Sequence, residues 1–232
     1  KTVDLSFFKA DNLWQRGDLK YIDSNGDGKV DPGKGTLSDH GDLKVIGNAT
    51  PKYSFGINLN AGYKGFEVSA LFQGVAKRQF PMAGGNYLYG GDCYFKEHLD
   101  HFSAQQPDAY LPRLVDTNTQ DFEANTGYNT TRYLLNAAYI RLKNLMVSYT
   151  FKPQMLKSIG LSNLKVYLTC DNLFTISKLP QQFDPETINQ VNSWVGGSND
   201  AAPALTSPLK ANGNGRVYPM NRNFVFGIDV TF

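Results

Sequence analysis

The residues with the clearest chemical potential form an Asp/Asn/Gly-rich segment near the N-terminus. Asp23-Ser24-Asn25-Gly26-Asp27-Gly28-Lys29-Val30-Asp31 carries side-chain oxygens at alternate positions and a glycine at the sixth. This is the spacing of the first nine residues of an EF-hand-type calcium loop, where the glycine lets the chain turn sharply so that the oxygens converge. The predicted ligands are the side chains of Asp23, Asn25, Asp27 and Asp31 and the backbone carbonyl of Lys29.

The segment departs from the calcium-loop pattern at its twelfth position, where Lys34 replaces a bidentate Glu. A carboxylate from further along the chain, Asp39 or Asp42, would have to complete the shell. The alternative interpretation is an Asp/Asn/Gly-rich turn that binds no ion. The spacing favours a structural Ca²⁺ or similar hard cation that holds a long loop, and no flanking helical pattern indicates a calcium sensor.

Other candidate chemistry is weaker. Glu97-His98-Leu99-Asp100-His101 has two histidines at i and i+3 beside acids, but this is not the His-Glu-x-x-His order, and a solvated loop is the favoured interpretation. The sequence contains no Gly-x-Ser-x-Gly, P-loop or Cys-x-x-Cys motif. We therefore expect no enzymatic activity. Aromatic residues in predicted loops suit either ligand stacking or loop packing: Tyr87, Tyr89, Tyr94, Phe183 and Trp194.

The composition favours strands over membrane helices. The mean hydropathy of −0.38 excludes a helical membrane protein. Aromatic residues make up 13% and charged residues 19% of the 232 residues, which is more aromatic and less charged than a typical soluble domain. A membrane β-barrel has this profile, because its strands alternate polar and apolar residues. No basic patch is interleaved with aromatics, so no nucleic-acid partner is expected. The two cysteines, Cys93 and Cys170, are best interpreted as unrelated apolar residues.

Period-two alternation predicts about five strands. The clearest is the last, where Phe224, Phe226, Ile228, Val230 and Phe232 alternate with mostly small or polar residues, and the terminal Phe suits the aromatic girdle of an outer-membrane barrel. Residues 53–63 and 66–73 form a hairpin around a two-residue turn. Further strands are predicted at 139–151, with a β-bulge near Asn144, and at 164–171.

The connections between these strands divide into short and long ones. Those at 64–65 and 152–163 are short, whereas 77–138 and 175–222 are long, as periplasmic turns and extracellular loops are in outer-membrane barrels. The predicted fold class is all-β, an antiparallel transmembrane β-barrel. The predicted domains are an extracellular loop with the calcium-type motif (1–52) and about five C-terminal barrel strands with two long extracellular loops (53–232).

Five strands are too few to close such a barrel, since the smallest have about eight and an open edge in lipid leaves backbone groups unsatisfied. The chain is therefore expected to be a C-terminal part of a larger barrel, whose remaining N-terminal part supplies the other strands.

Several segments together resemble SusC/RagA-type TonB-dependent transporters of the Bacteroidetes outer membrane. They include Asp171-Asn172-Leu173-Phe174, Asp184-Pro185-Glu186 and Tyr218-Pro219. The remaining resembling segments are residues 17–31, 41–51, 53–56, 63–66, 72–74 and 138–149, together with the closing strand. The resemblance covers most of the chain and follows the family's order.

The resemblance implies a barrel of about 22 strands around an N-terminal plug that this sequence does not contain. It implies uptake of oligosaccharides or oligopeptides with a SusD-like surface lipoprotein, energised by TonB through the N-terminal part. It also favours Asp42 over Asp39 as the completing ligand, because members with a shorter loop carry a further acid there. The competing hypothesis is a calcium-stabilised extracellular adhesion or binding module with a soluble β-sandwich.

Overall fold

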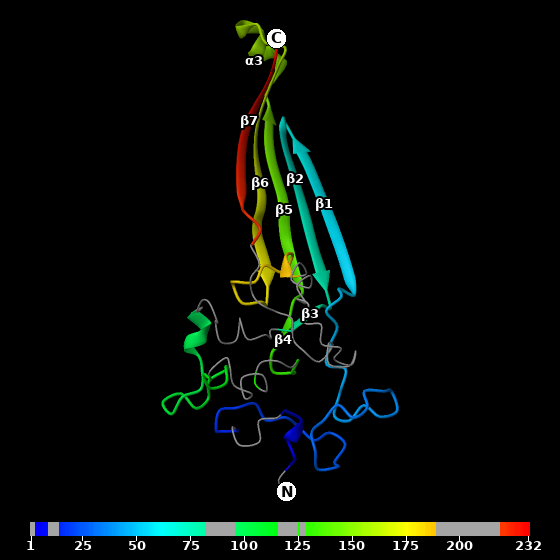
Figure 1. Ribbon diagram of the computed structural model, residues 1–232. Helices are drawn as coiled ribbons and strands as arrows, with labels where there is room; N and C mark the ends of the chain where they lie inside the picture. Colours follow the sequence, from blue (N-terminus) through cyan, green and yellow to red (C-terminus); the bar gives the residue numbers. More distant parts are fainter. Residues whose placement is uncertain (1–2, 9–13, 82–95, 116–124, 126–128, 189–218) are drawn as a thin grey trace, which may run out of the picture. The chain divides into compact units, whose positions relative to one another are not determined.

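The computed structural model describes residues 3–8, 14–81, 96–115, 125, 129–188 and 219–232. Its strands are β1 (Tyr53–Tyr63), β2 (Phe66–Ala76), β3 (Gln79–Pro81), β4 (Leu134–Asn136), β5 (Tyr139–Thr150), β6 (Asn163–Ser177) and β7 (Asn223–Thr231) (Figure 1). Its helical turns are η1 (Ser6–Phe8), η2 (Lys96–Leu99), α3 (Pro153–Leu156) and η3 (Lys157–Ile159). Over these ranges, no helix has the length and apolar character to cross a membrane.

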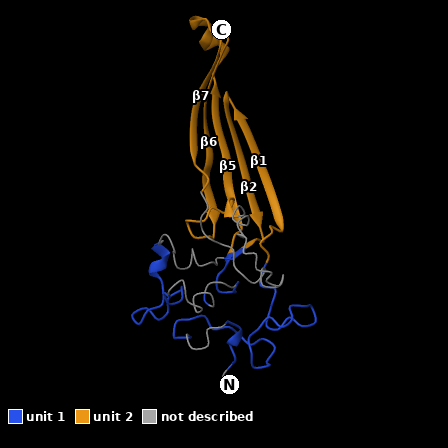
Figure 2. Cartoon of the chain, viewed as in Figure 1, with its two compact units in different colours: residues 1–47, 80–135, 189–216 blue, residues 48–79, 136–188, 217–232 orange. Residues whose placement is uncertain are grey.

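The chain divides into two compact units, coloured separately in Figure 2. The sheet unit comprises residues 48–79, 136–188 and 217–232, and the loop unit comprises residues 1–47, 80–135 and 189–216. The calcium-type segment belongs to the loop unit, whereas β1, β2, β5, β6 and β7 belong to the sheet unit.

The sheet unit is built on a five-stranded antiparallel sheet in the order β1-β2-β5-β6-β7. β1 and β2 pair from Tyr53 opposite Ala76 to Tyr63 opposite Phe66, so the hairpin closes on Lys64 and Gly65 as predicted. Lys64 (φ 48°) and Gly65 (φ 93°) both lie in the left-handed region, as tight two-residue hairpin turns require. The five predicted strands and their antiparallel arrangement are confirmed.

The predicted bulge is also confirmed, and it involves two strands. Leu142 and Asn144 of β5 pair with consecutive residues of β2, so Lys143 has no paired residue in that strand. Against β6, the register also shifts between Leu142 and Asn144, and Asn172 there adopts a left-handed conformation with φ 51°. The extra residue keeps apolar side chains on one face on both sides of the shift.

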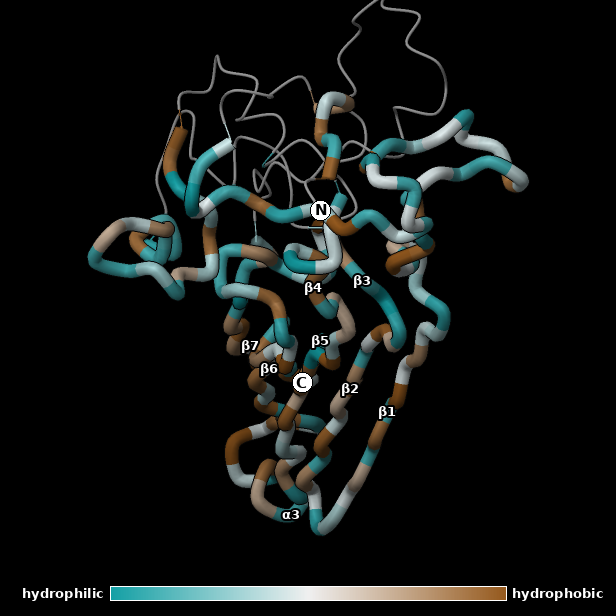
Figure 3. Tube along the Cα trace, turned by 90° about the horizontal axis from the view of Figure 1, so that it is seen from below, coloured by the Kyte–Doolittle hydropathy of each residue, from teal (hydrophilic) through white to brown (hydrophobic). Residues whose placement is uncertain are grey.

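Side chains alternate between the two faces of the sheet, and the strand register brings apolar ones together on one face. We call this the apolar face; across its strands it includes Phe55, Ile57, Leu59, Val68, Phe72, Leu142, Val147, Leu168, Phe226 and Ile228. The other face is called the polar face. Figure 3 shows hydrophobic and hydrophilic residues succeeding one another along β1. An antiparallel sheet can thus present two chemically different surfaces.

Both short connections lie at the same end of the sheet, here called the turn end, where Tyr63 faces Phe66 and Thr150 faces Lys165. The β5–β6 connection contains α3, which begins at Pro153 because proline suits the first helical turn. η3 follows and stops at Gly160, whose φ of 71° favours glycine. The opposite end, here called the loop end, is where Tyr53 faces Ala76.

Candidate functional site

The calcium-type segment forms a closed turn in the loop unit. The Asp23 carboxylate accepts hydrogen bonds from the backbone N–H groups of Gly26 (2.6 Å) and Gly28 (2.9 Å). Both glycines have positive φ, 81° and 90°, a conformation that L side chains rarely adopt. Within the same turn, the Asp27 carboxylate accepts the Lys29 N–H at 2.8 Å. The Asp and Gly positions of the motif therefore have a local structural role independent of any ion.

Asp42 closes this turn from the other side, and Asp39 does not. The Asp42 carboxylate accepts the backbone N–H groups of Ser24 (2.5 Å) and Asp31 (3.0 Å), and its own N–H donates to the Asp31 carbonyl. Asp39 instead forms an ion pair with Lys34 at 3.7 Å. The structure thus brings Asp42 into the loop, which is the acid that the family resemblance favoured.

The donor set suits a hard cation only in part. Every predicted ligand is an oxygen, as Ca²⁺ requires. However, the carboxylates of Asp23, Asp27 and Asp31 each accept a backbone N–H. Within the described ranges, no group of three or more His, Cys, Asp or Glu residues is arranged to hold a metal. A bound Ca²⁺ at Asp23, Asn25, Asp27, Lys29, Asp31 and Asp42 stays a prediction, and it requires these oxygens to turn toward a common centre.

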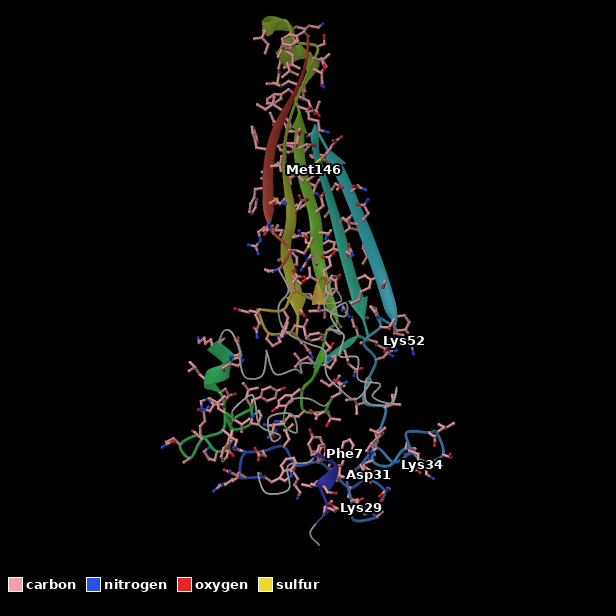
Figure 4. The ribbon with its side chains drawn as sticks, viewed as in Figure 1. Phe7, Lys29, Asp31, Lys34, Lys52 and Met146 are labelled. Atoms are coloured by element: carbon pink, nitrogen blue, oxygen red, sulfur yellow. The ribbon has the colours of Figure 1, made fainter. Side chains whose placement is uncertain are left out.

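An aromatic cluster supports the turn. Phe8 and Val30 are buried, and Trp14 and Tyr21 pack against them. The rings of Phe8 and Tyr21 are stacked with centroids 4.4 Å apart. Backbone hydrogen bonds between residues 4 and 28 and between residues 30 and 4 add a short bridge. The last positions of the motif are therefore fixed to the chain's first residues (Figure 4 labels Phe7, Lys29, Asp31 and Lys34).

With the residues that the structure describes, the histidine-containing segment does not assemble a metal site. His98 is buried in η2, rather than solvated as the loop interpretation suggested, and its carbonyl contacts the His101 ring nitrogen at 2.9 Å. The Asp100 carboxylate accepts a hydrogen bond from Gln106. Of the aromatic loop residues, Phe183 is buried in the sheet unit, which favours packing over ligand stacking. Tyr87, Tyr89, Cys93, Tyr94 and Trp194 lie outside the described residues.

The sequence did not reveal the most strongly built polar cluster, which lies in the sheet unit. Arg141, with 3% of its side chain exposed, donates to Asp184 at 2.8 Å and to Glu186 at 2.6 Å. Lys143, the bulge residue, also donates to Glu186. The cluster holds the segment after β6 against β5. Asp184-Pro185-Glu186 was noted as part of the family resemblance. Its ion pair with Arg141 was not predictable, because the two residues are 43 positions apart in the sequence.

The surroundings of Asp184 stabilise its charged form. Burial alone would raise its pKa. The backbone N–H groups of Glu186 and Met220 and the guanidinium of Arg141 outweigh that effect, so the pKa of Asp184 lies below its ordinary value of 3.8. The carboxylate is therefore ionised at neutral pH and fully hydrogen-bonded, as a buried charge must be.

The two faces of the sheet have opposite chemistry. On the apolar face Leu59 is 55% exposed and Phe226 is 68% exposed. On the polar face, Lys165 pairs with Glu67 at 2.8 Å, and Asn144 donates to Asp171 at 2.8 Å. All five strands carry exposed large apolar side chains, whereas exposed apolar residues on a soluble protein are normally scattered singly. Such a continuous face indicates a surface that contacts another apolar phase.

The strand lengths fit a bilayer. β1 and β2 each contain 11 residues. At about 3.3 Å per residue such a strand is about 36 Å long, and a tilt near 45° gives it a height of about 25 Å. This equals the apolar band of about 25 Å in outer-membrane barrels. Tyr53 and Tyr63 occupy the two ends of β1, where interfacial aromatics are expected.

Comparison with curated proteins gives three relatives from Formosa agariphila. The chain is 26% identical to TonB-dependent receptor P3 over 77% of its length and 26% identical to TonB-dependent receptor P26 over 93%. It is 24% identical to TonB-dependent receptor P39 over 96%. The chain spans only 18% to 20% of the length of these relatives. No protein-family model matches it.

Comparison with solved structures shows a shared fold. The chain matches the RagAB peptide transporter with a TM-score of 0.52 and 23% identity, over 80% of this chain and 18% of the other. It matches the RagAB peptide importer in its open-open and closed-closed states with TM-scores of 0.54. The predicted all-β class and the resemblance to SusC/RagA-type proteins are confirmed. None of the relatives' names describes an enzyme, in agreement with the expected absence of catalysis.

Proposed function

We propose that this chain forms part of the barrel wall of a SusC/RagA-type, TonB-dependent nutrient importer in a bacterial outer membrane. The apolar face would contact lipid and the polar face would line the lumen. The single observation that carries the proposal is the division of the five-stranded sheet into an exposed apolar face and a polar face. A soluble sandwich would bury the face that here exposes Ile57, Leu59 and Phe226.

The cargo and partners follow from the family resemblance. We propose that the complete protein imports oligosaccharides or oligopeptides together with a SusD-like surface lipoprotein, and receives energy from TonB through its N-terminal part. The RagAB structures are those of a peptide importer, which supports the peptide alternative. The polar face supports a hydrated path, because its ion pairs and amides remain solvated only if water reaches that side.

The orientation of β1 in the membrane tests the proposal directly. Single cysteines at 57, 58, 59 and 60 would be spin-labelled in the complete receptor, with Cys93 and Cys170 replaced by Ala. Labels at Ile57 and Leu59 should collide with oxygen dissolved in lipid, and labels at Asn58 and Asn60 with a water-soluble nickel chelate. The period of two follows from the alternation of side chains along a strand.

The same labels distinguish the competing hypothesis. In a soluble β-sandwich module, Leu59 would be shielded from both collision partners and the protein would remain in solution without detergent. That pattern would reject a lipid-facing wall. Uptake of labelled oligosaccharides or peptides by cells that carry the receptor would then separate the two cargo classes.

A further inference from the structure

Two lysine side chains form cation–π contacts with the same tyrosine ring at the loop end of β1 and β2. The Nζ atoms of Lys52 and Lys77 each lie 5.8 Å from the centroid of the Tyr53 ring, so they are separated by no more than twice that distance. All three side chains are exposed. Tyr53 is the first residue of the apolar face, so this arrangement marks the boundary between that face and the loops (Figure 4 labels Lys52).

The backbone fixes this pair in position. Beyond the last paired residues of β1 and β2, the Lys52 N–H still donates to the Lys77 carbonyl. Next to it, the Gln79 N–H donates to the Asn48 carbonyl, and the Asn48 N–H donates to the Gln79 side chain at 2.7 Å. Lys77 itself has φ 51°, a conformation unusual for a residue with a side chain. The chain thus holds both ammonium groups near the Tyr53 ring, with Lys77 in a left-handed conformation.

The two ammonium groups have no carboxylate partner within the described part of the chain. Among the residues that the structure describes, Lys52 and Lys77 form no ion pair. In the sheet unit, the ion-paired acids Asp184, Glu186 and Glu67 are bound to Arg141, Lys143 and Lys165. Like charges around one ring repel each other, and an anion held between them removes that repulsion.

We propose that Lys52, Lys77 and Tyr53 bind the phosphate headgroup of a membrane lipid in the leaflet at the loop end. This rests on the proposed function, because a headgroup reaches these side chains only if the apolar face lies in a bilayer. Tyrosine rings and lysine ammonium groups at the edge of an apolar surface sit at headgroup level, and clustered basic residues there bind anionic lipids. The lipid's acyl chains would extend along the apolar residues of β1, beginning with Phe55.

The chain offers a matched control at the turn end of the same strand. Lys64 lies 5.0 Å from the centroid of the Tyr63 ring, and it also has a left-handed backbone, with φ 48°. It differs in that a single lysine meets the ring. Lys77→Gln and Lys64→Gln therefore carry the same backbone cost and remove the same charge, but only the first disrupts the paired site.

The test uses the complete receptor in phosphatidylcholine nanodiscs, with phosphatidic acid as the probe and diacylglycerol as its phosphate-free counterpart. Native mass spectrometry would measure retained lipid. The wild type should retain phosphatidic acid over diacylglycerol, and affinity should fall about fivefold for each lysine lost in K52Q/K77Q. K64Q should behave as the wild type, and K52R/K77R should restore binding because arginine keeps the charge.

Three results would overturn the inference. The first is equal retention of phosphatidic acid by the wild type and K52Q/K77Q, and the second is equal retention of diacylglycerol and phosphatidic acid by the wild type. The third is displacement of phosphatidic acid by inorganic phosphate at equal concentration, which would indicate a site for free phosphate. A spin label at Leu59 in the same nanodiscs separates this from the proposed function. If Leu59 contacts lipid while retention is unchanged, the headgroup site fails and the barrel wall stands.

Discussion

At the scale of single residues, Asp23 and Asp42 show why an Asp/Asn/Gly loop has two interpretations. The Asp23 carboxylate accepts two backbone N–H groups of the turn, and the Asp42 carboxylate accepts three. A carboxylate oxygen with a free lone pair can accept such a bond and also coordinate Ca²⁺. The same carboxylates can therefore stabilise the turn when no ion is bound and coordinate Ca²⁺ when it is bound. A binding measurement distinguishes the two interpretations.

Terbium luminescence provides that measurement, because Tyr21 lies two residues before Asp23 and can sensitise a bound Tb³⁺, a common stand-in for Ca²⁺. The wild-type receptor should show saturable luminescence that Ca²⁺ competes away. D23A/D27A should lose it and also lose calcium-dependent protection of residues 1–52 from proteases, since two of the predicted ligands are removed. D39A, which removes only the ion pair with Lys34, should leave both signals unchanged. Absence of any Ca²⁺-competed luminescence in the wild type would favour the ion-free turn.

Asp184 is the residue on which the polar cluster of the sheet unit depends. Replacing it with Asn leaves Arg141, with 3% of its side chain exposed, without one of its two carboxylate partners. Loss of one partner of a buried ion pair costs roughly 3–5 kcal/mol. We expect D184N to lower the free energy of unfolding, measured by denaturant titration of the receptor in detergent, by an amount near the lower value because Glu186 remains. E67Q, which breaks the exposed pair with Lys165, should have a much smaller effect.

The pH dependence of this difference has a definite sign. The pKa of Asp184 is below 3.8 in the folded protein, so its carboxylate contributes stability that is fully present above 3.8. The contribution disappears as the pH falls through the lower, folded pKa, where Asp184 becomes protonated in both states. The wild type and D184N should therefore converge in stability on acidification below 3.8. A difference in the free energy of unfolding between the wild type and D184N that increases in acid would show that folding does not stabilise the charged carboxylate.

At the scale of elements, β6 shows where alternation along the sequence stops being informative. Alternation predicted a strand at 164–171, whereas β6 continues to Ser177. The polar pair Asp171-Asn172 interrupts the pattern, and Phe174 and Ile176 beyond it continue the apolar face opposite Leu142 and Ile140. A polar pair inside a period-two pattern resembles the end of a strand, because a single sequence does not distinguish a bulge from a turn.

Gly74 in β2 illustrates an element-level constraint that a single sequence does not display. A Cβ at this position would collide with the Tyr139 carbonyl of β5 and come within 2.6 Å of Phe55 Cζ. A backbone oxygen in a paired strand cannot move aside, so G74A should destabilise the sheet by about 1–3 kcal/mol.

Gly56, in the neighbouring strand β1, is the control for that substitution. Its nearest atom would be the Phe72 carbonyl oxygen at an ordinary 3.8 Å. Alanine loses less backbone freedom than glycine on folding, so G56A should be neutral or more stable by up to about 1 kcal/mol. Opposite signs for the two variants in one denaturant titration are the expected result. Equal decreases in stability for G74A and G56A would mean that the close approach of the Tyr139 carbonyl is not what requires a glycine at position 74.

At the scale of the whole molecule, the five strands of the main sheet were predictable, whereas β3, β4 and the partners of individual polar side chains were not. Residues 53–63 alternate so regularly that the predicted and observed strand coincide. The Arg141–Asp184 pair spans 43 residues, and the Asp42 carboxylate reaches Ser24 across 18 residues. Alternation is a local property of a chain in contact with two phases, whereas a side-chain partner depends on how distant loops return to the sheet.

The division into two faces leads to a final prediction for the receptor in lipid. Leu59 lies opposite Ala70, in the middle of β1, and Asn60 lies opposite Ser69 on the polar face. A lysine on the lipid side of a barrel costs about 2–4 kcal/mol at the bilayer midplane, because its charge must be removed from water. L59K should therefore decrease the free energy of unfolding of the receptor in phosphatidylcholine vesicles by that amount, as measured by urea titration.

N60K places the same charge one residue further along the same strand, on the face proposed to meet water. It should fold within about 1 kcal/mol of the wild type, since the lysine stays hydrated in the lumen. Both variants introduce the same side chain and the same charge, at neighbouring positions of β1. A large loss in L59K alone is expected if the two faces of β1 contact an apolar and an aqueous phase, and equal losses would show that β1 does not separate such phases.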